Sequence, residues 1–270
     1  MPHSGALFEP LDFRKDADGA TKHINKWVAD QTRDLIPAGA LNELTRLVLA
    51  NAIYLKAPWA SEFSDTSTKP KPFHVRGTQI VDLPTMNRRG EFGYAKRDGF
   101  TAVSLSYSGG ELQFLILLPD EVNGLRALES KMNADVLWQC AKLEARDVDL
   151  YLPKFKLEPP TIALADKLKA LGMKSAFDEP RGSADFDRIA PRQPNDYLYI
   201  SQVFHKTFVA VDEKGTEAAA ATAVVMMKAT AMTGPKPEAI EVRVDHPFIY
   251  AVQHVPSGAC LFIGCVTDPR

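Results

Sequence analysis

The residue types that most often carry out enzymatic chemistry are scattered along this sequence. The six histidines stand at positions 3, 23, 74, 205, 246 and 254, and no helical pair among them is spaced to hold a metal ion. The sequence contains no Gly-x-Ser-x-Gly elbow, Walker loop, His-Glu-x-x-His or Gly-x-Gly-x-x-Gly motif. We therefore expect that the protein is not an enzyme and that it needs no cofactor and no metal.

The three cysteines, Cys140, Cys260 and Cys265, are too few and too unevenly spaced for a disulfide framework or a zinc site. Cys260 and Cys265 are five residues apart on a predicted strand, which places them on opposite faces. We interpret all three as free thiols, most of them buried.

Composition places the chain among ordinary globular proteins, with 45 % apolar and 24 % charged residues over 270 positions. The formal net charge of −2 gives no reason to expect nucleic acid or an anionic membrane as a partner. We find no run of eighteen apolar residues, and the first five residues lack the features of a signal peptide. The length suits one large domain or two small ones.

One stretch, Glu213 to Val225, has a composition that is unusual for a static element. Its four consecutive alanines favour an exposed helix when they are considered alone. The flanking runs Val203–Asp212 and Val242–Val252 are of strand type, however, and they favour a small-residue loop between two strands. If the loop entered a sheet with Thr216 facing inward, every inward residue would be small or β-branched and uncharged, so joining a sheet would bury little polarity.

The remaining elements must position this loop. We predict a helix from Asp16 or Asp18 to about Leu35 and a central strand, buried on both faces, over Leu47–Leu55. A glycine hairpin should join Val103–Tyr107 to Leu112–Leu118. Further predicted elements are helices over Leu125–Leu143 and Thr161–Leu171 and a last strand pair ending near Val266. The clustering of strands and helices favours an α+β fold.

Four segments resemble the serpins, a family of inhibitors that trap serine proteases by inserting a cleaved loop into their own sheet. Phe204–Thr222 resembles the strand and hinge before the reactive loop, and Asp245–Tyr250 resembles the signature after it. Asn51–Trp59 is similar to the strand beside the opening in the large sheet, and Tyr151–Phe155 to a strand at its upper end. Loop insertion is a form of strand addition, and we expect it here because the resemblance implies it.

The resemblance implies roles for particular residues. His205, which on its own is better explained as a core histidine than as a general base, would bridge with Asn51 the central strands that must part. Glu213 and Lys154 would form an ion pair where insertion begins; otherwise they are solvated charges of little energetic value. The implied sheet-opening set is Asn51, Trp59, Lys154 and His205. The implied hinge set is Glu213, Gly215, Thr216, Ala218, Ala219, Ala220, Ala221 and Thr222.

The family's usual spacing from the hinge glycine places the cleaved bond between Ala229 and Thr230, inside a reactive-centre loop at about residues 213–241. A small residue there suits an elastase-like or subtilisin-like serine protease. A shift of one residue in this spacing places the cleaved bond after Lys228, which would suit a trypsin-like protease. A shift of two residues places it after Met227.

The resemblance covers nearly all of this chain, but the chain corresponds only to the later two thirds of the family. We therefore expect a single partial serpin domain over residues 1–270, with a large mixed β-sheet, further sheets and surface helices, but without the family's amino-terminal helices. Two functions remain open: inhibition of serine proteases by loop insertion, and a non-inhibitory binding protein or inactive fragment. An extracellular or periplasmic location is favoured only by the resemblance.

Overall fold

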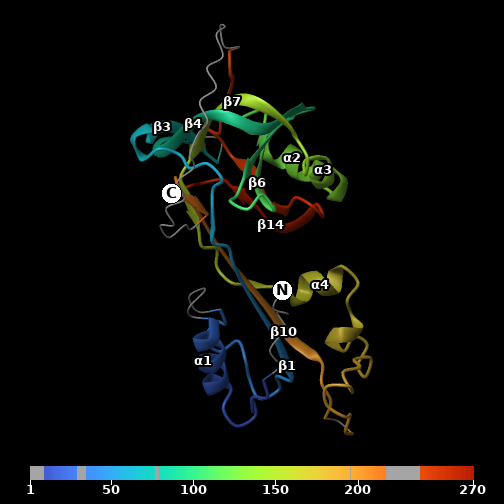
Figure 1. Cartoon of the computed structure of the whole chain (residues 1–270). Helices are drawn as coiled ribbons and strands as arrows, with labels where there is room; N and C mark the ends of the chain where they lie inside the picture. Colours follow the sequence, from blue (N-terminus) through green and yellow to red (C-terminus); the bar gives the residue numbers. More distant parts are fainter. Residues whose placement is uncertain (1–8, 29–34, 77–78, 195, 217–237) are drawn as a thin grey trace. The chain divides into compact units, whose positions relative to one another are not determined.

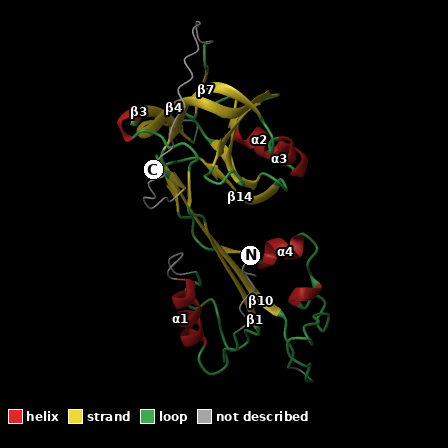
Figure 2. Cartoon of the chain, viewed as in Figure 1, coloured by secondary structure: helices red, strands yellow, loops and turns green. Residues whose placement is uncertain are grey.

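The computed structural model describes residues 9–28, 35–76, 79–194, 196–216 and 238–270. The chain divides into two compact units (Figure 1). The first contains residues up to Tyr54 together with Glu158–Phe208, and the second contains Leu55–Leu157 together with Val209–Arg270. Strands dominate and the helices are short (Figure 2), so the predicted α+β class is confirmed.

The first unit contains a parallel strand pair. Strand β1 (Leu47–Tyr54) lies beside β10 (Ile200–Val211), whose last three residues belong to the second unit. On the other edge of β10 lies the short antiparallel strand β9 (Ile162–Ala163). The prediction that β1 is buried on both faces is wrong: among the described residues it pairs only with β10, and Leu49 is 43 % exposed. The continuous apolar run identified the strand but not its exposure.

Helix α1 (Ala17–Val28) begins where the sequence predicted, because the Asp16 carboxylate accepts a 2.7 Å hydrogen bond from the amide of Gly19. Leu35, where we predicted the helix to end, lies in a bend. The Asn25 side chain bonds the backbone of Leu35 and Ile36 and fastens this bend to the helix.

Helix α4 (Ala165–Ala170) is shorter than predicted because the preceding residues join β9. It is followed by Gly172, whose φ of +101° only glycine adopts readily, and by the 3₁₀ helix η2 (Ser175–Phe177).

The second unit is built on an eight-stranded sheet, in the order β12-β7-β4-β5-β6-β13-β14 with β3 beside β4. All neighbours are antiparallel except β12 and β7. The predicted glycine hairpin is β5–β6. The strands are β3 (Lys69–Val75), β4 (Gln79–Arg97), β5 (Phe100–Ser106), β6 (Leu112–Pro119), β7 (Glu144–Pro153), β12 (Ile240–Arg243), β13 (Phe248–His254) and β14 (Ala259–Val266).

The predicted helix Leu125–Leu143 is in fact two helices, α2 (Leu125–Lys131) and α3 (Ala134–Gln139). The break occurs at Asn133, whose side-chain oxygen accepts a bond from the amide of Val136 and so caps a new helix. The expectation that most cysteines are buried is also wrong. All three are free, but only Cys140 is buried, whereas Cys260 and Cys265 are exposed.

Three two- or three-residue strands complete the second unit: β2 (Ala57–Pro58), β8 (Phe155–Leu157) and β11 (Gly215–Thr216), with a 3₁₀ helix η1 at Asp65–Ser67. In the part of the chain that is described, no helix has the length and apolar character needed to cross a membrane. Within the same residues, no three His, Cys, Asp or Glu side chains cluster as metal ligands would.

Candidate functional site

Near the start of the predicted loop, Gly215 and Thr216 form strand β11 beside the end of β10. A tight turn reverses the chain, because the Asp212 carboxylate accepts bonds from the amides of Lys214 and Gly215. Thr216 then lies opposite Val211 in antiparallel register. The start of the predicted hinge is therefore already part of a sheet.

Gly215 is required at this position by a close approach of two backbones. A Cβ atom there would lie 2.2 Å from the carbonyl oxygen of Ala57 and 2.7 Å from the Cα of Pro58. Those two residues form β2, the other neighbour of β11. Only glycine lets β11 lie this near to β2.

Thr216 is anchored by its side chain. It is fully buried, and its hydroxyl shares a hydrogen bond with that of Tyr107. Burial raises the pKa of Tyr107, although the bond to Thr216 acts in the opposite direction. Tyr107 stacks on Trp59 at 4.7 Å between ring centroids, and the Trp59 indole nitrogen donates to the carbonyl of Asp212 at 2.9 Å. The turn before β11 and Thr216 within β11 are thus held by the same aromatic pair, Trp59 and Tyr107.

Glu213 and Lys154, which the resemblance paired, lie in contact. The Glu213 carboxylate is almost completely buried and accepts bonds from Lys154 Nζ at 2.7 Å and Thr68 Oγ1 at 2.8 Å. Burial alone would raise the pKa of Glu213, but the bonds from Lys154 and Thr68 outweigh it and lower that pKa. This is a partly buried, hydrogen-bonded ion pair and not a pair of solvated charges.

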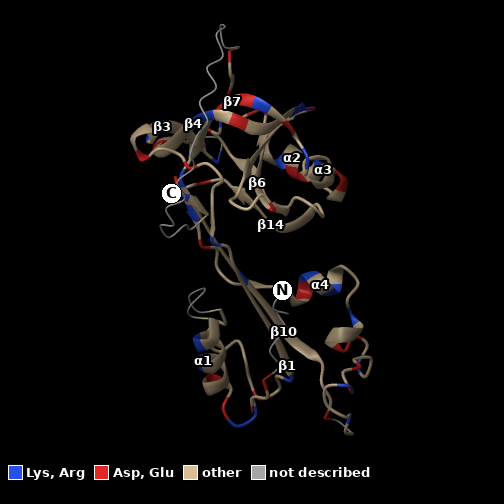
Figure 3. Ribbon diagram, in the orientation of Figure 1, with Lys and Arg blue, Asp and Glu red and all other residues tan. Residues whose placement is uncertain are grey.

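In the first unit, Asn51 and His205 are register partners on the adjacent strands β1 and β10. The Asn51 side chain is exposed and His205 is half-buried. Among the described residues, no hydrogen bond joins the two side chains, so their role as a bridge stays a prediction. Charged residues are mixed in sign over both units (Figure 3), whereas β1 carries no charge and β10 only Lys206.

At the far end of the predicted loop, β12 begins at Ile240 and pairs in parallel with β7. The segment Asp245–Tyr250 follows. It is held in place by His246, which contacts the Asp245 carboxylate at 2.7 Å and the carbonyl of Pro119 at 2.8 Å. Burial alone would lower the pKa of His246, but these two acceptors raise it. The other hinge residues and the candidate cleaved bond lie outside the described residues: Ala218, Ala219, Ala220, Ala221, Thr222, Met227, Lys228, Ala229 and Thr230.

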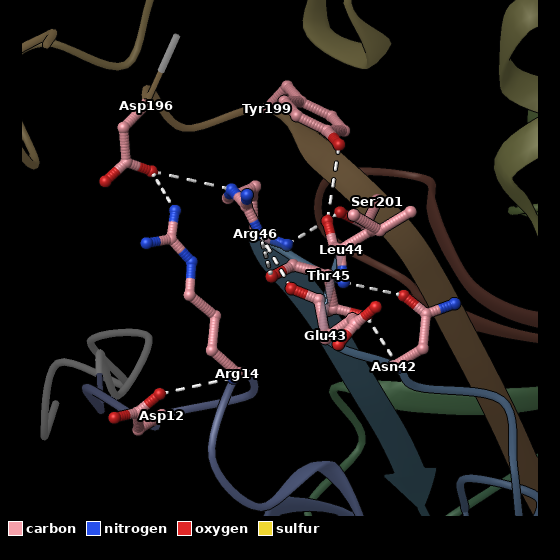
Figure 4. A network of polar contacts seen from close by, with 10 residues as sticks. All are labelled: Asp12, Arg14, Asn42, Glu43, Leu44, Thr45, Arg46, Asp196, Tyr199 and Ser201. Atoms are coloured by element: carbon pink, nitrogen blue, oxygen red, sulfur yellow. Dashed lines mark hydrogen bonds and ion pairs between the residues drawn. The ribbon is translucent and has the colours of Figure 1, made fainter.

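A polar network that the sequence did not predict ties the residues before β1 to those before β10 (Figure 4). Asp196 contacts Arg14 at 2.7 Å and Arg46 at 3.6 Å. The amide of Arg46 donates to the Ser201 hydroxyl at 2.9 Å, and the Tyr199 hydroxyl donates to a backbone carbonyl before β1. These contacts join residues that are at least 150 positions apart in sequence, so no local pattern indicates the network. The network fastens the amino ends of both strands.

Comparison with known proteins identifies the family. The family model described as "Serpin (serine protease inhibitor)" matches residues 3–269. The chain belongs to the serpin family. Leukocyte elastase inhibitor A of Rattus norvegicus is 36 % identical over 278 residues, covering 98 % of this chain and 70 % of that one. Serpin B10 of Sorex araneus is 35 % identical over 274 residues, covering 98 % and 66 %.

Solved serpin structures confirm the fold. Uncleaved ovalbumin superposes with a TM-score of 0.79 at 29 % identity, covering 97 % of this serpin and 65 % of ovalbumin. Serpin48 of Tenebrio molitor gives 0.78 at 31 %, covering 96 % and 67 %. This serpin thus spans about two thirds of the length of the relatives it matches. None of these comparisons supports an extracellular location.

Proposed function

We propose that this serpin inhibits serine proteases as a suicide substrate. A protease would attack the loop at about residues 213–241, and the released hinge would insert as a strand between β10 and β1. The observation that carries the proposal is β11: the hinge already starts as a strand on β10, antiparallel to it and anchored through Thr216 and Glu213. Family membership and relatives named as elastase inhibitors support the same conclusion.

The register of β11 defines where an inserted hinge would lie. Thr216 is opposite Val211, so a continuation along β10 would place Ala218 opposite Val209 and Thr222 opposite His205. His205 now has Asn51 as its partner on β1. Insertion therefore requires β1 to leave β10 and to pair with the hinge instead.

The energy of this exchange is favourable. Breaking the β1–β10 ladder, which aligns eight residues of β1 with β10, removes one set of backbone bonds, and an inserted hinge makes two sets. The net gain is about one ladder, on the order of 5–8 kcal/mol at roughly 1 kcal/mol for each bond. Displacing one oxyanion-hole donor costs a protease about 3–4 kcal/mol of catalysis, so insertion can stall the acyl-enzyme.

For the cleaved bond we propose Ala229–Thr230, with Lys228 and Met227 as alternative target residues. The small side chain of Ala229 suits an elastase-like or subtilisin-like protease, and relatives named leukocyte elastase inhibitor favour the elastase-like class. Lys228 would instead direct a trypsin-like enzyme to the loop. The new amino terminus of the released peptide decides between these positions.

The test is to mix the purified chain separately with elastase, subtilisin and trypsin and to analyse each mixture on a denaturing gel. A covalent band at the summed mass is expected. Ala220→Arg should abolish this band and leave the loop cleavable, because residue 220 would face into the sheet after insertion. Ala219→Arg is the matched control, since its side chain would face outward. Equal inhibition by both variants would rule out insertion.

A second candidate, a non-inhibitory serpin or inactive fragment, is favoured by one observation. Among the described residues β1 has no strand neighbour besides β10, and it is only partly buried. After insertion β1 would pair with the hinge in place of β10, and with no strand on its other edge it would be held weakly. Cleavage of the loop without a covalent band would support this candidate.

A further inference from the structure

A cavity of about 440 Å³ lies in the second unit, between β4, β5 and the segment that follows α3. Apolar side chains of Phe92, Leu143 and Val255 form part of its wall. Its volume falls in the range of about 300–1,000 Å³ that is common for small-molecule sites. The polar part of the wall contains Ser61, Arg88, Glu91, Ser104, Ser106 and Lys142.

Arg88 is the unusual member of this wall. Its guanidinium lies 4.2 Å from the ring centroid of Phe92 and 5.5 Å from that of Phe63, both of which are buried. Its Nε atom is the only buried side-chain nitrogen or oxygen of the described residues without a hydrogen-bond partner. Within those residues Arg88 also makes no ion pair. Desolvation lowers the pKa of Arg88, in agreement with this environment.

A buried guanidinium nitrogen such as Nε of Arg88 is costly, because it has lost hydration and has gained no acceptor among the described residues. The neighbouring Arg89 shows the usual solution: it lies on the surface and contacts the Asp147 carboxylate at 2.7 Å. Stacking on two aromatic rings holds Arg88 in place but uses none of its N–H donors, for which the described residues supply no acceptor. An anion entering the cavity would supply the missing acceptor.

We propose that this cavity binds a small organic acid, with its carboxylate on Arg88 and its apolar body against Phe92, Leu143 and Val255. A carboxylate matches the planar donor fork of a guanidinium. Arg88, Lys142 and Glu91 together give the wall one net positive charge, which suits a monoanion better than a phosphate dianion. The hydroxyls of Ser104 and Ser106 add donors beside it. This site is independent of loop insertion.

The experiment is a fluorescence titration of the full chain with dansylglycine, which carries a carboxylate on a naphthalene ring. Dansylamide has the same ring without the carboxylate and serves as the matched ligand. We expect dansylglycine to bind at least tenfold more tightly than dansylamide and to weaken as salt is raised. Equal affinity for the two ligands would overturn the proposal, because it would indicate an apolar surface without anion recognition.

Two variants locate the binding. Arg88→Met should reduce dansylglycine affinity about tenfold, to the level of dansylamide, whereas Arg89→Met removes the same charge nearby and should change it less than twofold. Arg88→Met should fold, since it replaces an unpaired cation by an apolar chain of similar length. Lys142→Gln, at an exposed position, is a second test, and it should reduce dansylglycine affinity about threefold. Unchanged affinity in both Arg88→Met and Lys142→Gln would refute the site.

Discussion

Substituting Gly215 by alanine tests whether the close packing of β11 against β2 anchors the start of the loop. The added Cβ would meet the carbonyl oxygen of Ala57 at 2.2 Å, where a carbon and an oxygen normally approach to about 3.3 Å. The obstructing atoms are backbone, so a side-chain rotation cannot relieve the overlap, and β11 must move away from β2 by about 1 Å. That movement breaks the two-residue pairing and the bond from the Trp59 amide to the Lys214 carbonyl.

Losing two or three backbone hydrogen bonds at roughly 1 kcal/mol each predicts a local destabilisation of about 3 kcal/mol. Hydrogen exchange measured by mass spectrometry on the peptide containing Asp212–Thr216 should therefore accelerate about a hundredfold. Lys214→Ala is the control, because that side chain is exposed and its contacts are made by the backbone. If the Gly215→Ala peptide exchanged within threefold of the unmodified chain, the packing argument would fail.

Two further predictions concern the same anchor. Glu213→Gln should lower the melting temperature at pH 7, because hydrogen bonds to a charged group contribute about 1.5–3 kcal/mol. The pKa of Glu213 is lowered in the folded state, so its contribution is present above its unfolded pKa and is lost as pH falls through the folded value. The difference in melting temperature from the unmodified chain should then shrink in acid; a difference independent of pH would contradict the ion pair. Tyr107→Phe should cost about 1–3 kcal/mol in urea unfolding, because it leaves the buried Thr216 hydroxyl unpaired. Adding Thr216→Val should recover part of that loss, and strict additivity would show that the two hydroxyls do not interact.

Several elements were predicted correctly because a short stretch of sequence, such as an apolar run, a glycine turn or a helix cap, is enough to identify them. The apolar runs of β6 and β10 and the glycine turn after β5 placed those strands correctly, and Asp16 marked the start of α1. The same reasoning did not find β3, because its prolines Pro70 and Pro72 argue against a strand. The structure accommodates them because, in the part of the chain that is described, β4 is the only strand that pairs with β3, which therefore lies at an edge of the sheet.

Only some of the residues that hold the start of the loop could be identified from the sequence. Gly215 and Glu213 stood out because they match a family motif. The partner of Thr216, however, is Tyr107, 109 residues earlier, and the indole of Trp59 bonds a carbonyl 153 residues later. Such contacts depend on which strands become neighbours, and no local pattern contains that information. Arg88 was missed for a similar reason, since its lack of a partner is visible only once the sheet is assembled.

The contacts around β1 and β10 indicate the order in which this strand pair would open under the proposed mechanism. Because the strands are parallel, their amino ends lie together, and there Arg46, Ser201, Tyr199 and Asp196 join the segments leading into them. At their carboxyl ends the rings of Tyr54 and Phe208 lie 6.1 Å apart, and β10 continues from there to the turn into β11. A hinge entering from β11 therefore meets first the end that lacks this network. Its last residues would have to pass the fastened end, so under the proposed mechanism the network would limit how far insertion proceeds and β11 would set where it begins.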